Sequence, residues 1–288
     1  MRILIPAICQ QGQVYAHFWL STVDCLKQSM AYNSEVYRKL DQEMASKIIQ
    51  QIPGFDVTKP EHQKLLADSR NLPQNTREFE RAYRAESIEL NFYSIGGESL
   101  LGRARNHVAQ IALTEGFDKV LFIDCDEGFT WNDVVTLVKA PYPIAGGVVP
   151  LKAFFQPGSF ETSLNFLPFN EDEMFFDDSI RTLKSTLRMA RAKKSKWLKV
   201  AFTGTGFLCI DTSVFAKLAE TSAEYLYPNP RTGMPELHWS FFDGGPINNS
   251  YLSEDWSLCE RARAAGYDIM INADVRAVHV GPHVFVAG

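Results

Sequence analysis

The sequence lacks several patterns that identify large classes of protein. Its five cysteines are scattered and none form a CxxC pair, so neither a zinc ribbon nor a disulfide scaffold is expected. No run reaches the roughly 20 apolar residues that cross a membrane, and the apolar start is too short for a secretion signal. Cysteine usage of this kind suits a reducing compartment. We therefore expect a soluble protein of the cytoplasm with no transmembrane segment.

Three nucleotide and hydrolase motifs are missing as well. No GxGxxG follows the first apolar run, which disfavours a dinucleotide oxidoreductase, and the GxSxG and P-loop patterns are absent. Basic residues are not in excess either: the chain has 34 acidic and 29 basic side chains, and its formal net charge is −5. This balance argues weakly against a nucleic-acid partner, although a total can hide local clusters.

What is present fits a globular protein with a full core. The 288 residues are 45% hydrophobic and 22% charged, and they suffice for one large domain or two small ones. Apolar runs predict strands at residues 2–8, 87–95, 119–124, 143–149, 200–211 and 268–280. Periodicity and capping residues predict helices at residues 13–31, 99–115 and 256–265, with Ser99 as a cap and Gly116 and Gly266 as stops. Alternating strands and helices predict an α/β fold with a mainly parallel sheet flanked by helices.

Residues 34–85 differ from the rest of the chain in composition. This stretch is highly charged, and Pro53-Gly54, Pro60 and Pro73 divide it into short pieces. Pieces of this length cannot enclose a core of their own. We therefore interpret residues 34–85 as a helical insertion.

The sharpest motif is a carboxylate pair at a strand end. Asp124 and Asp126 belong to the run FIDCD, at the end of the buried strand predicted at 119–124. Ligands of open α/β sheets bind beyond the carboxyl ends of the strands, and carboxylate oxygens suit Mg²⁺ or Mn²⁺, which also bind a diphosphate. A D-x-D pair also arises by chance, so a solvated strand end with one Asp capping the next helix is the alternative.

Three further features strengthen the functional interpretation. Arg103 and Arg105 lie at a predicted helix start, where arginines and backbone N–H groups attract phosphate. Glu254 and Asp255 follow Ser253 at another helix start, where they are candidates for a general base. His279 ends the last apolar run and is a candidate metal ligand. Each also has a structural explanation: an exposed amphipathic helix, acids favoured by the helix dipole, and an ordinary histidine near a strand end.

Taken in order, these motifs resemble a GT-A glycosyltransferase near the large family-2-like group, in the style of enzymes encoded by phages and large viruses. The order is a first strand ending near Pro6, then RARN, FIDCD, AGGVV, GTGFLCID, SEDWSLCER and VHVG. The resemblance covers most of the chain except residues 34–85 and 165–199. It implies a GT-A (Rossmann-like) fold with helical insertions, as one domain over residues 1–288. Residues 1–128 would form the nucleotide-sugar half and residues 129–288 the acceptor half.

The resemblance also implies an activity and a set of site residues. The enzyme would move a hexosyl or pentosyl group from a nucleoside-diphosphate sugar, a UDP-sugar above all, with Mn²⁺ or Mg²⁺ as cofactor. Asp124, Asp126 and His279 would hold the metal, Asp255 would be the catalytic base, and Glu254 would lie beside it. The residues that would contact the donor are Pro6, Ala7, Ile8, Gln10, Arg103, Arg105, Asn106, Asp124, Cys125, Thr205 and Gly206.

The acceptor is less constrained than the donor. Residues 181–199 contain eight Lys or Arg and no acid, and we predict a basic helix over 180–199. Such a helix is either a solvated face or a surface that follows a phosphate backbone. With the viral resemblance, it favours phage DNA carrying 5-hydroxymethylpyrimidines in the host cytoplasm, contacted by Lys184, Arg188, Arg191 and Lys194. A cell-surface glycan, lipid or protein is the alternative acceptor.

Two other classes remain as alternatives. A nucleotidyltransferase also uses two carboxylates and a metal, but it typically has a Gly-rich, Lys-containing loop after its first strand, where this chain has PAICQQG. A module that binds carbohydrate or nucleic acid without catalysis is the second. Turnover of a sugar nucleotide separates it from an enzyme.

Overall fold

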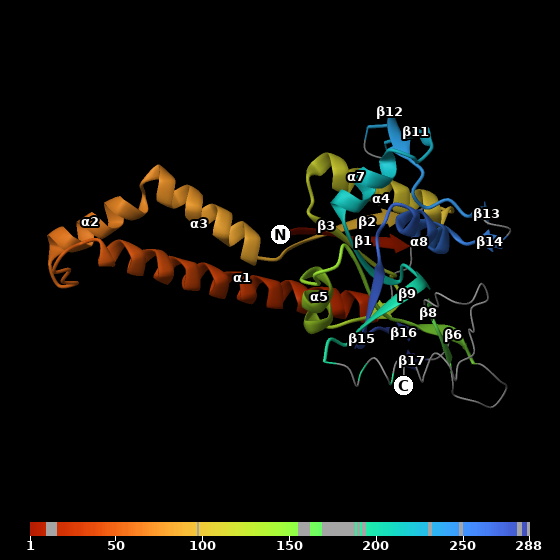
Figure 1. Ribbon diagram of the computed structural model, residues 1–288, viewed down its shortest axis with the longest axis horizontal. Coiled ribbons are helices and arrows are strands. Elements are labelled where there is room, and N and C mark those ends of the chain that lie inside the picture. Colours follow the sequence, from red (N-terminus) through yellow and green to blue (C-terminus); the bar gives the residue numbers. More distant parts are fainter. Residues whose placement is uncertain are drawn as a thin grey trace. The chain divides into compact units, whose positions relative to one another are not determined.

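The computed structural model describes residues 1–9, 16–96, 98–154, 162–168, 188, 191, 194–229, 232–247, 250–280 and 284–286 (Figure 1). Its helices are α1 (Ala16–Gln50), α2 (Pro60–Arg70), α3 (Pro73–Glu86), α4 (Leu101–Glu115), α5 (Trp131–Val138), α7 (Thr212–Ala219) and α8 (Glu254–Ala264). Its strands are β1 (Arg2–Cys9), β2 (Glu89–Gly96), β3 (Lys119–Ile123), β4 (Glu127–Gly128), β5 (Ile144–Val148), β6 (Pro150–Phe154), β7 (Thr162–Leu164), β8 (Phe166–Pro168), β9 (Trp197–Thr203), β10 (Phe207–Asp211), β11 (Glu224–Pro228), β12 (Pro235–Trp239), β13 (Gly245–Ile247), β14 (Ser250–Leu252), β15 (Ile269–Arg276), β16 (Val278–Val280) and β17 (Val284–Val286).

The chain divides into two compact units. One consists of residues 3–25 and 91–288 and contains the sheet, and we call it the sheet unit. The other consists of residues 1–2 and 26–90 and is built from α1 beyond residue 25, α2 and α3, and we call it the helical unit.

A mixed sheet forms the centre of the sheet unit. Among the described residues its eight strands have the order β2-β1-β3-β10-β5-β15-β9-β8. β1 and β3 are parallel, and so are β5 and β15, whereas β10 and β9 run antiparallel to their neighbours. The strands β1, β3, β5, β15 and β8 therefore share one direction. The predicted α/β class, with most strands in one direction, is confirmed.

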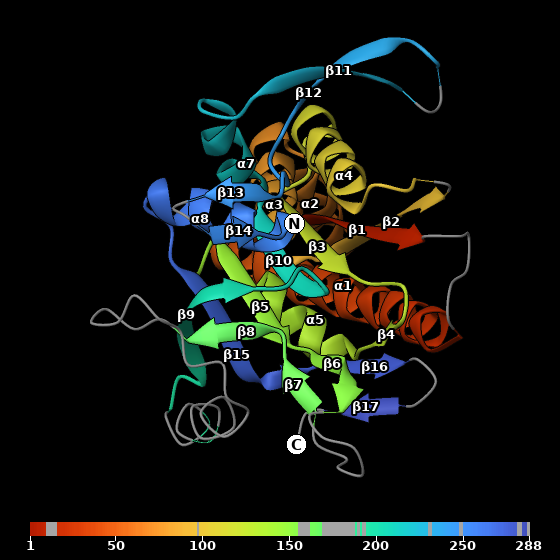
Figure 2. The same ribbon diagram turned by 90° about the vertical axis from the view of Figure 1, so that its right-hand side faces the viewer.

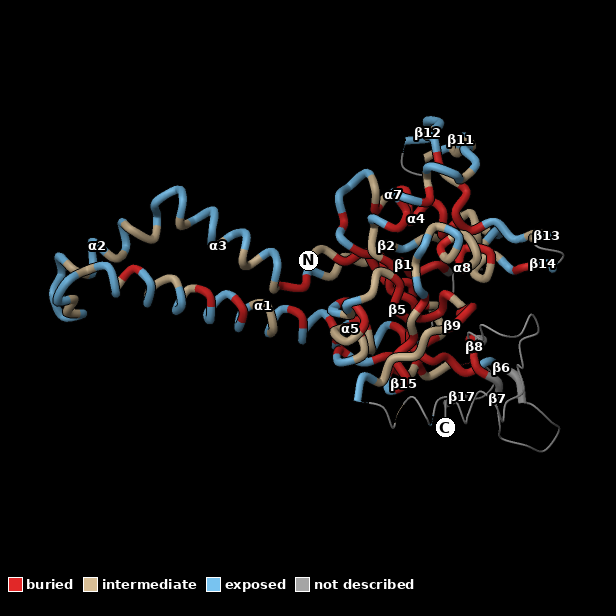
Figure 3. Tube along the Cα trace, viewed as in Figure 1, coloured by how far each residue is buried: buried red, intermediate tan, exposed pale blue. Residues whose placement is uncertain are grey.

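Successive side chains along each strand point to opposite faces of this sheet, and both faces are covered by apolar residues. Val120, Phe122, Leu208 and Ile210 belong to a core that also takes apolar residues from α4, α7 and α8. Figure 2 shows these three helices together on one side of the sheet. On the other face, Phe207 meets Phe129 at 6.0 Å between ring centroids. Figure 3 shows that buried residues are concentrated in the sheet strands.

Several predicted boundaries needed correction. The predicted strand at 200–211 is two strands, β9 and β10, because residues 204–206 form a turn between them. The strand at 268–280 is likewise split at Ala277. Leu100, and not Ser99, is the N-cap of α4, whereas Gly116 ends this helix with φ +69° as expected. The N-terminal strand β1 runs on to Cys9, because all residues from Ile3 to Ile8 are buried in the sheet.

Helix α1 continues past Ala31, where the helix predicted over residues 13–31 was expected to end. Asparagine side chains can compete with the hydrogen bonds of a helix, but the side chain of Asn33 is occupied by Ile88. Its Nδ2 donates to the carbonyl oxygen of Ile88 and its Oδ1 accepts from the N–H of Ile88, both at 2.8 Å. The expected breaks beyond it are present. α1 ends at Gln50, and α2 and α3 begin with Pro60 and Pro73, where the missing N–H of proline costs nothing.

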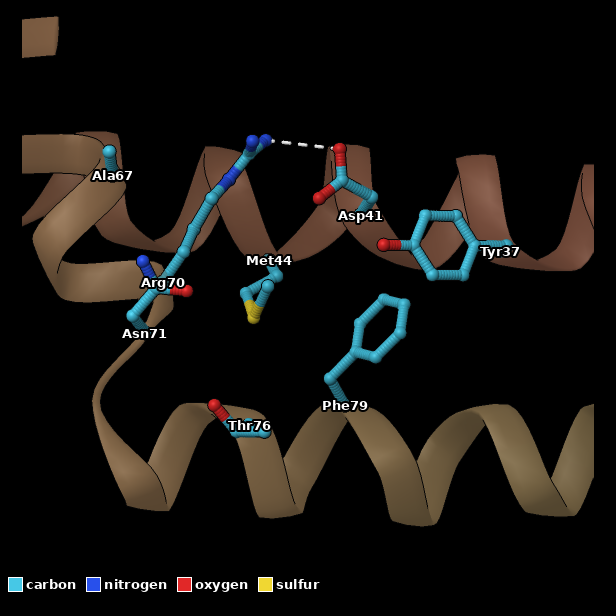
Figure 4. A pocket seen from close by; sticks show the side chains of 8 residues that line it. All are labelled: Tyr37, Asp41, Met44, Ala67, Arg70, Asn71, Thr76 and Phe79. Atoms are coloured by element: carbon cyan, nitrogen blue, oxygen red, sulfur yellow. Dashed lines mark hydrogen bonds and ion pairs between the residues drawn. The ribbon is translucent and has the colours of Figure 1, made fainter.

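The helical unit contains a pocket of about 390 Å³ between its three helices (Figure 4). An ion pair between Arg70 and Asp41, at 3.1 Å, spans it, and the ring of Phe79 lies on its opposite wall. The pocket contains none of the side chains that the sequence singles out. In the described part of the chain, no helix combines the length and the apolar character needed to cross a membrane.

Candidate functional site

The D-x-D turn lies directly after β3 and is held by backbone hydrogen bonds. The N–H of Asp124 donates to the carbonyl of Gly206 at 3.0 Å, and that of Glu127 donates to the carbonyl of Asp124 at 3.0 Å. The N–H of Val280 donates to the carbonyl of Asp126 at 2.8 Å. The turn between β9 and β10 and the strand β16 therefore both converge on this strand end.

Asp126 is bound by two cationic or basic side chains. Lys152 of β6 forms an ion pair with its Oδ2, and Nε2 of His279 lies 3.4 Å from its Oδ1. Burial alone would raise the pKa of Asp126, but the hydrogen bonds from His279 and Lys152 outweigh it and lower the pKa. Nδ1 of His279 is 2.7 Å from the carbonyl oxygen of Pro150, so this nitrogen carries the proton. The other ring nitrogen, Nε2, faces the carboxylate of Asp126.

Glu127 is a buried acid next to this pair. Its side chain is fully buried, and in the described part of the chain neither carboxyl oxygen has a hydrogen-bond partner. Burial, and then the charges of Asp124 and Asp126, raise its pKa well above the ordinary range. Gly206 makes this position possible, because a Cβ there would lie 2.3 Å from Oε1 of Glu127. The glycine of the GTG turn is thus required by the close approach of an acid.

A second network joins the strand end to the start of α8. Arg105 is only 3% exposed, and it donates from Nη1 to Oε1 of Glu254 at 2.8 Å. Its Nη2 lies 3.5 Å from Oδ1 of Asp124. The guanidinium group therefore holds together acids from two elements that are 130 residues apart in the sequence.

Asp255, the next residue on α8, has different surroundings from Glu254. Its Oδ1 accepts hydrogen bonds from the hydroxyl of Ser253 and from the N–H of Trp256, the latter at 2.8 Å. Its Oδ2 is turned toward Gly204, where a Cβ would be 3.4 Å away. Burial, the largest effect, raises the pKa of Asp255 despite these hydrogen bonds and the charge of Arg105.

The arrangement fits a divalent cation that receives part of its coordination from a ligand. In the described ranges no three Asp, Glu, His or Cys side chains gather around one point. Asp126 and His279 do converge, and the hydrogen bond from Nδ1 to a backbone carbonyl is the usual support of a metal-binding histidine. Glu127, whose side-chain oxygens have no partner among the described residues, follows Asp126 directly in the chain. Mg²⁺ and related ions commonly use one or two protein ligands and fill the remaining positions with phosphate and water. Of the predicted ligands, Asp124 is paired with Arg105 instead.

Some residues expected to contact the donor lie elsewhere. Pro6, Ala7 and Ile8 were expected to contact the donor, but they are buried inside β1, which continues to Cys9. Gln10 lies outside the described residues. Asn106 is buried, and its Oδ1 accepts from the N–H groups of Phe241 at 2.9 Å and Phe242 at 2.8 Å.

Other residues expected to contact the donor lie in the turns at the end of β3 or on α4. Cys125 lies in the D-x-D turn and is partly exposed, and Thr205 is buried in the next turn with an unpartnered hydroxyl among the described atoms. Arg103 forms a two-pronged ion pair with Glu98, at 2.8 and 2.7 Å, and this lowers the pKa of Glu98 to about 2. Its charge is therefore already balanced by this carboxylate.

The basic segment is described only in part. Lys184 lies outside the described residues, Arg188 and Lys194 are exposed, and Nε of Arg191 donates to the carbonyl of Ala273 at 3.1 Å. The helix predicted over 180–199 is wrong at residues 197–199, because these belong to β9, which begins at Trp197 and pairs with β15. The β-branched and aromatic run from Trp197 to Thr203 favours a strand over the charge periodicity.

Two important residues were missed by the sequence analysis. Lys152 belongs to no recognisable sequence motif, and only the position of β6 in the fold brings it to Asp126. Glu98 directly precedes a predicted helix start, and an acid five residues before Arg103 was a weak signal for their ion pair.

No known protein family and no curated protein matches the sequence. Among solved structures, A197 from STIV aligns over 100% of this chain and 95% of its own, at 12% identity and a TM-score of 0.44. GalNAc-T7, solved with UDP, GalNAc and Mn²⁺, aligns over 97% of this chain at 11% identity and a TM-score of 0.45, and the alignment spans 43% of that protein. A UDP-glucose pyrophosphorylase with UDP-glucose aligns over 96% and 92% of the two chains at 9% identity and a TM-score of 0.37. These similarities do not by themselves assign the chain to any of the three families.

Proposed function

We propose that the protein is a metal-dependent glycosyltransferase of the GT-A type that uses a nucleoside-diphosphate sugar. The observation that carries the proposal is the convergence at the end of β3 of Asp126, His279 and Lys152 on one side and of Asp124, Arg105 and Glu254 on the other. The first group can bind a cation and phosphate oxygens. The second connects that position to a carboxylate pair on α8.

The residues have distinct tasks in this proposal. Asp126 and His279 would hold Mn²⁺ or Mg²⁺, which supplies stabilisation of the negative charge on a leaving diphosphate. Lys152, already beside Asp126, would turn its ammonium group to the phosphate oxygens of the donor. Arg105 keeps Asp124 and Glu254 in place and is itself too buried to move freely.

The transfer is a substitution at the anomeric carbon of the sugar. The acceptor hydroxyl loses its proton to a carboxylate, its oxygen forms the new bond to that carbon, and the bond to the diphosphate breaks. Asp255 is the proposed base, with Glu254 beside it, because burial of Asp255 brings its pKa closer to neutrality. The nucleoside diphosphate leaves with the electron pair of the broken bond.

The identity of the sugar, the viral origin and the DNA acceptor remain predictions. The DNA acceptor depends on residues 180–199, of which the structure describes only a part. A nucleotidyltransferase remains the other enzymatic possibility, and the products separate the two: sugar transfer releases a nucleoside diphosphate, whereas nucleotidyl transfer releases pyrophosphate.

The test is binding of Mn²⁺ in the presence of UDP, followed by electron paramagnetic resonance of the free ion, for the wild type and for Asp126→Asn. We expect the variant to lose more than the roughly 10–100-fold in affinity that removal of an outer partner of a metal ligand costs. Asp68→Asn makes the same chemical change at an exposed position of α2 and serves as the control. Equal Mn²⁺ binding by wild type and Asp126→Asn would reject the metal site, and release of pyrophosphate from a nucleoside triphosphate would reject the reaction.

A further inference from the structure

A second pocket opens in the sheet unit beside the proposed site. It has a volume of about 600 Å³, which is within the range of pockets for small ligands. Its walls come from the first turn of α4, the start of β11, the loop of residues 240–244 and the first residue of α8.

One side chain connects this pocket to the strand end. Glu254 forms part of the pocket wall and accepts the hydrogen bond from Arg105 at 2.8 Å. Arg105 in turn reaches Asp124 at the end of β3. A ligand in the pocket would therefore lie next to Glu254, which Arg105 links to the D-x-D turn.

The lining combines apolar surface with hydrogen-bond acceptors. Leu101 and Tyr225 contribute apolar and aromatic surface, against which the faces of sugar rings can pack, whereas the ring of Phe242 is only 1% exposed and packs on Phe122. Glu224, Asp243 and Glu254 contribute carboxylates, which accept hydrogen bonds but donate none when ionised. A complementary ligand must therefore bring donors, and hydroxyl or ammonium groups are such donors.

The charges around the pocket disfavour a strongly anionic ligand. Arg103 in its wall is already paired with Glu98. Arg261 lies behind the loop and donates to the carbonyls of Ser240 and Phe241 at 2.8 and 2.7 Å. Counting the wall and its direct partners in the described chain, acids outnumber arginines by one: the acids are Glu98, Glu224, Asp243 and Glu254, and the arginines are Arg103, Arg105 and Arg261. Phosphates of a nucleic acid need the opposite balance.

We infer that this pocket is the acceptor subsite and that it takes the end of an uncharged or amine-bearing glycan. The inference rests on the proposed glycosyl transfer and narrows its acceptor. The hydroxyl groups of the glycan donate to Glu254 and Asp243, and its rings pack on Leu101 and Tyr225. The reacting hydroxyl extends past Glu254 toward Asp255.

The experiment blocks the pocket without touching the carboxylates. Ala223 lines the pocket and is exposed, so Ala223→Trp fills it with a ring. Leu226 lies three residues further on, in β11, is 70% exposed and does not line the pocket, so Leu226→Trp is the matched control. Binding is followed by saturation-transfer NMR with cellobiose, N,N′-diacetylchitobiose, chitobiose with free amines, a sulfated heparin disaccharide and a short DNA duplex containing 5-hydroxymethylcytosine.

We expect the wild type and Leu226→Trp to bind a neutral or amino disaccharide and Ala223→Trp to bind it at least about tenfold more weakly, a loss of ~1.4 kcal/mol. The sulfated disaccharide should bind at least about tenfold more weakly than its neutral counterparts. Binding of UDP with Mn²⁺, measured by calorimetry, should be equal in all three proteins.

Two outcomes would overturn the inference: disaccharide binding that Ala223→Trp leaves unchanged, and DNA binding that Ala223→Trp abolishes while no disaccharide binds. Because the NMR experiment needs no donor, failure of the proposed function is seen separately. It would appear as absence of UDP binding in all three proteins, whatever the disaccharides do.

Discussion

Two adjacent carboxylates on the first turn of α8 acquire different properties from their surroundings. Glu254 is bound by the guanidinium of Arg105, whereas Asp255 is held by Ser253 and by a backbone N–H, and burial raises its pKa. Two carboxylates at consecutive positions thus have different surroundings, one in contact with Arg105 and the other the proposed base. Their order in the sequence predicted a candidate pair but not this division.

At the residue scale, Asp255→Asn should abolish transfer while UDP binding with Mn²⁺ is retained. Asp255 must be ionised to accept a proton, and burial raises its pKa. The rate kcat/KM of the wild type should therefore fall on acidification at a pH above the ordinary aspartate pKa of about 3.9. This is measured as a pH profile of nucleoside diphosphate release.

Glu254→Gln provides the comparison for that profile. It weakens the contact with Arg105 but leaves Asp255 ionisable, so its activity should fall while the acidic limb persists. An unchanged rate and an unchanged acidic limb in Asp255→Asn would show that another group is the base.

At the scale of elements, the site depends on a close approach between α4 and the loop before α8. A Cβ on Gly102 would lie 2.3 Å from the carbonyl oxygen of Phe242, which is backbone and cannot yield by a side-chain rotation. The same loop is held by Asn106, four residues further along α4. The RARN motif therefore owes part of its pattern to packing, in addition to any contact with a ligand.

Gly102→Ala should consequently lower the free energy of unfolding by about 1–3 kcal/mol and weaken disaccharide binding, because the loop must move away from α4. Gly116→Ala, at the other end of α4, meets no atom within 4 Å but requires φ +69°. It should cost about 1 kcal/mol and leave binding intact. Urea unfolding and NMR titration measure both, and equal binding by the two variants would contradict the assigned role of Gly102.

At the scale of the whole molecule, burial is divided unevenly between the two units. α4 has eight buried residues, whereas α2 and α3 have none (Figure 3). Helices derive most of their stability from packing of an apolar face, so α2 and α3 have little to oppose local opening.

Hydrogen exchange followed by mass spectrometry should show this difference. Peptides of α2 and α3 should exchange through local opening, orders of magnitude faster than peptides of α4, β3 and β10, which should require global unfolding. The amide of Ala67, exposed on α2, and that of Ala109, fully buried on α4, form a matched pair. Equal protection of the two would show that α2 and α3 are stabilised by contacts absent from the isolated chain.

Local chemistry alone determined much of this protein. The continuous apolar run of β3 predicts a buried strand and places Asp124 and Asp126 at its end, and Gly116, Pro60 and Pro73 mark helix boundaries by their own backbone restrictions. These features depend on residues close together in the chain. The α/β class followed from them.

Only the tertiary structure decided which side chains meet. Lys152, His279 and Asp126 come from three separate segments, and Glu127 tolerates burial only because Gly206 lies opposite it. The pocket beside Glu254 is formed by α4, β11 and a loop whose mutual positions no local pattern encodes. Periodicity is a short-range property of the chain, whereas an ion pair or a pocket requires long-range packing that brings distant segments together.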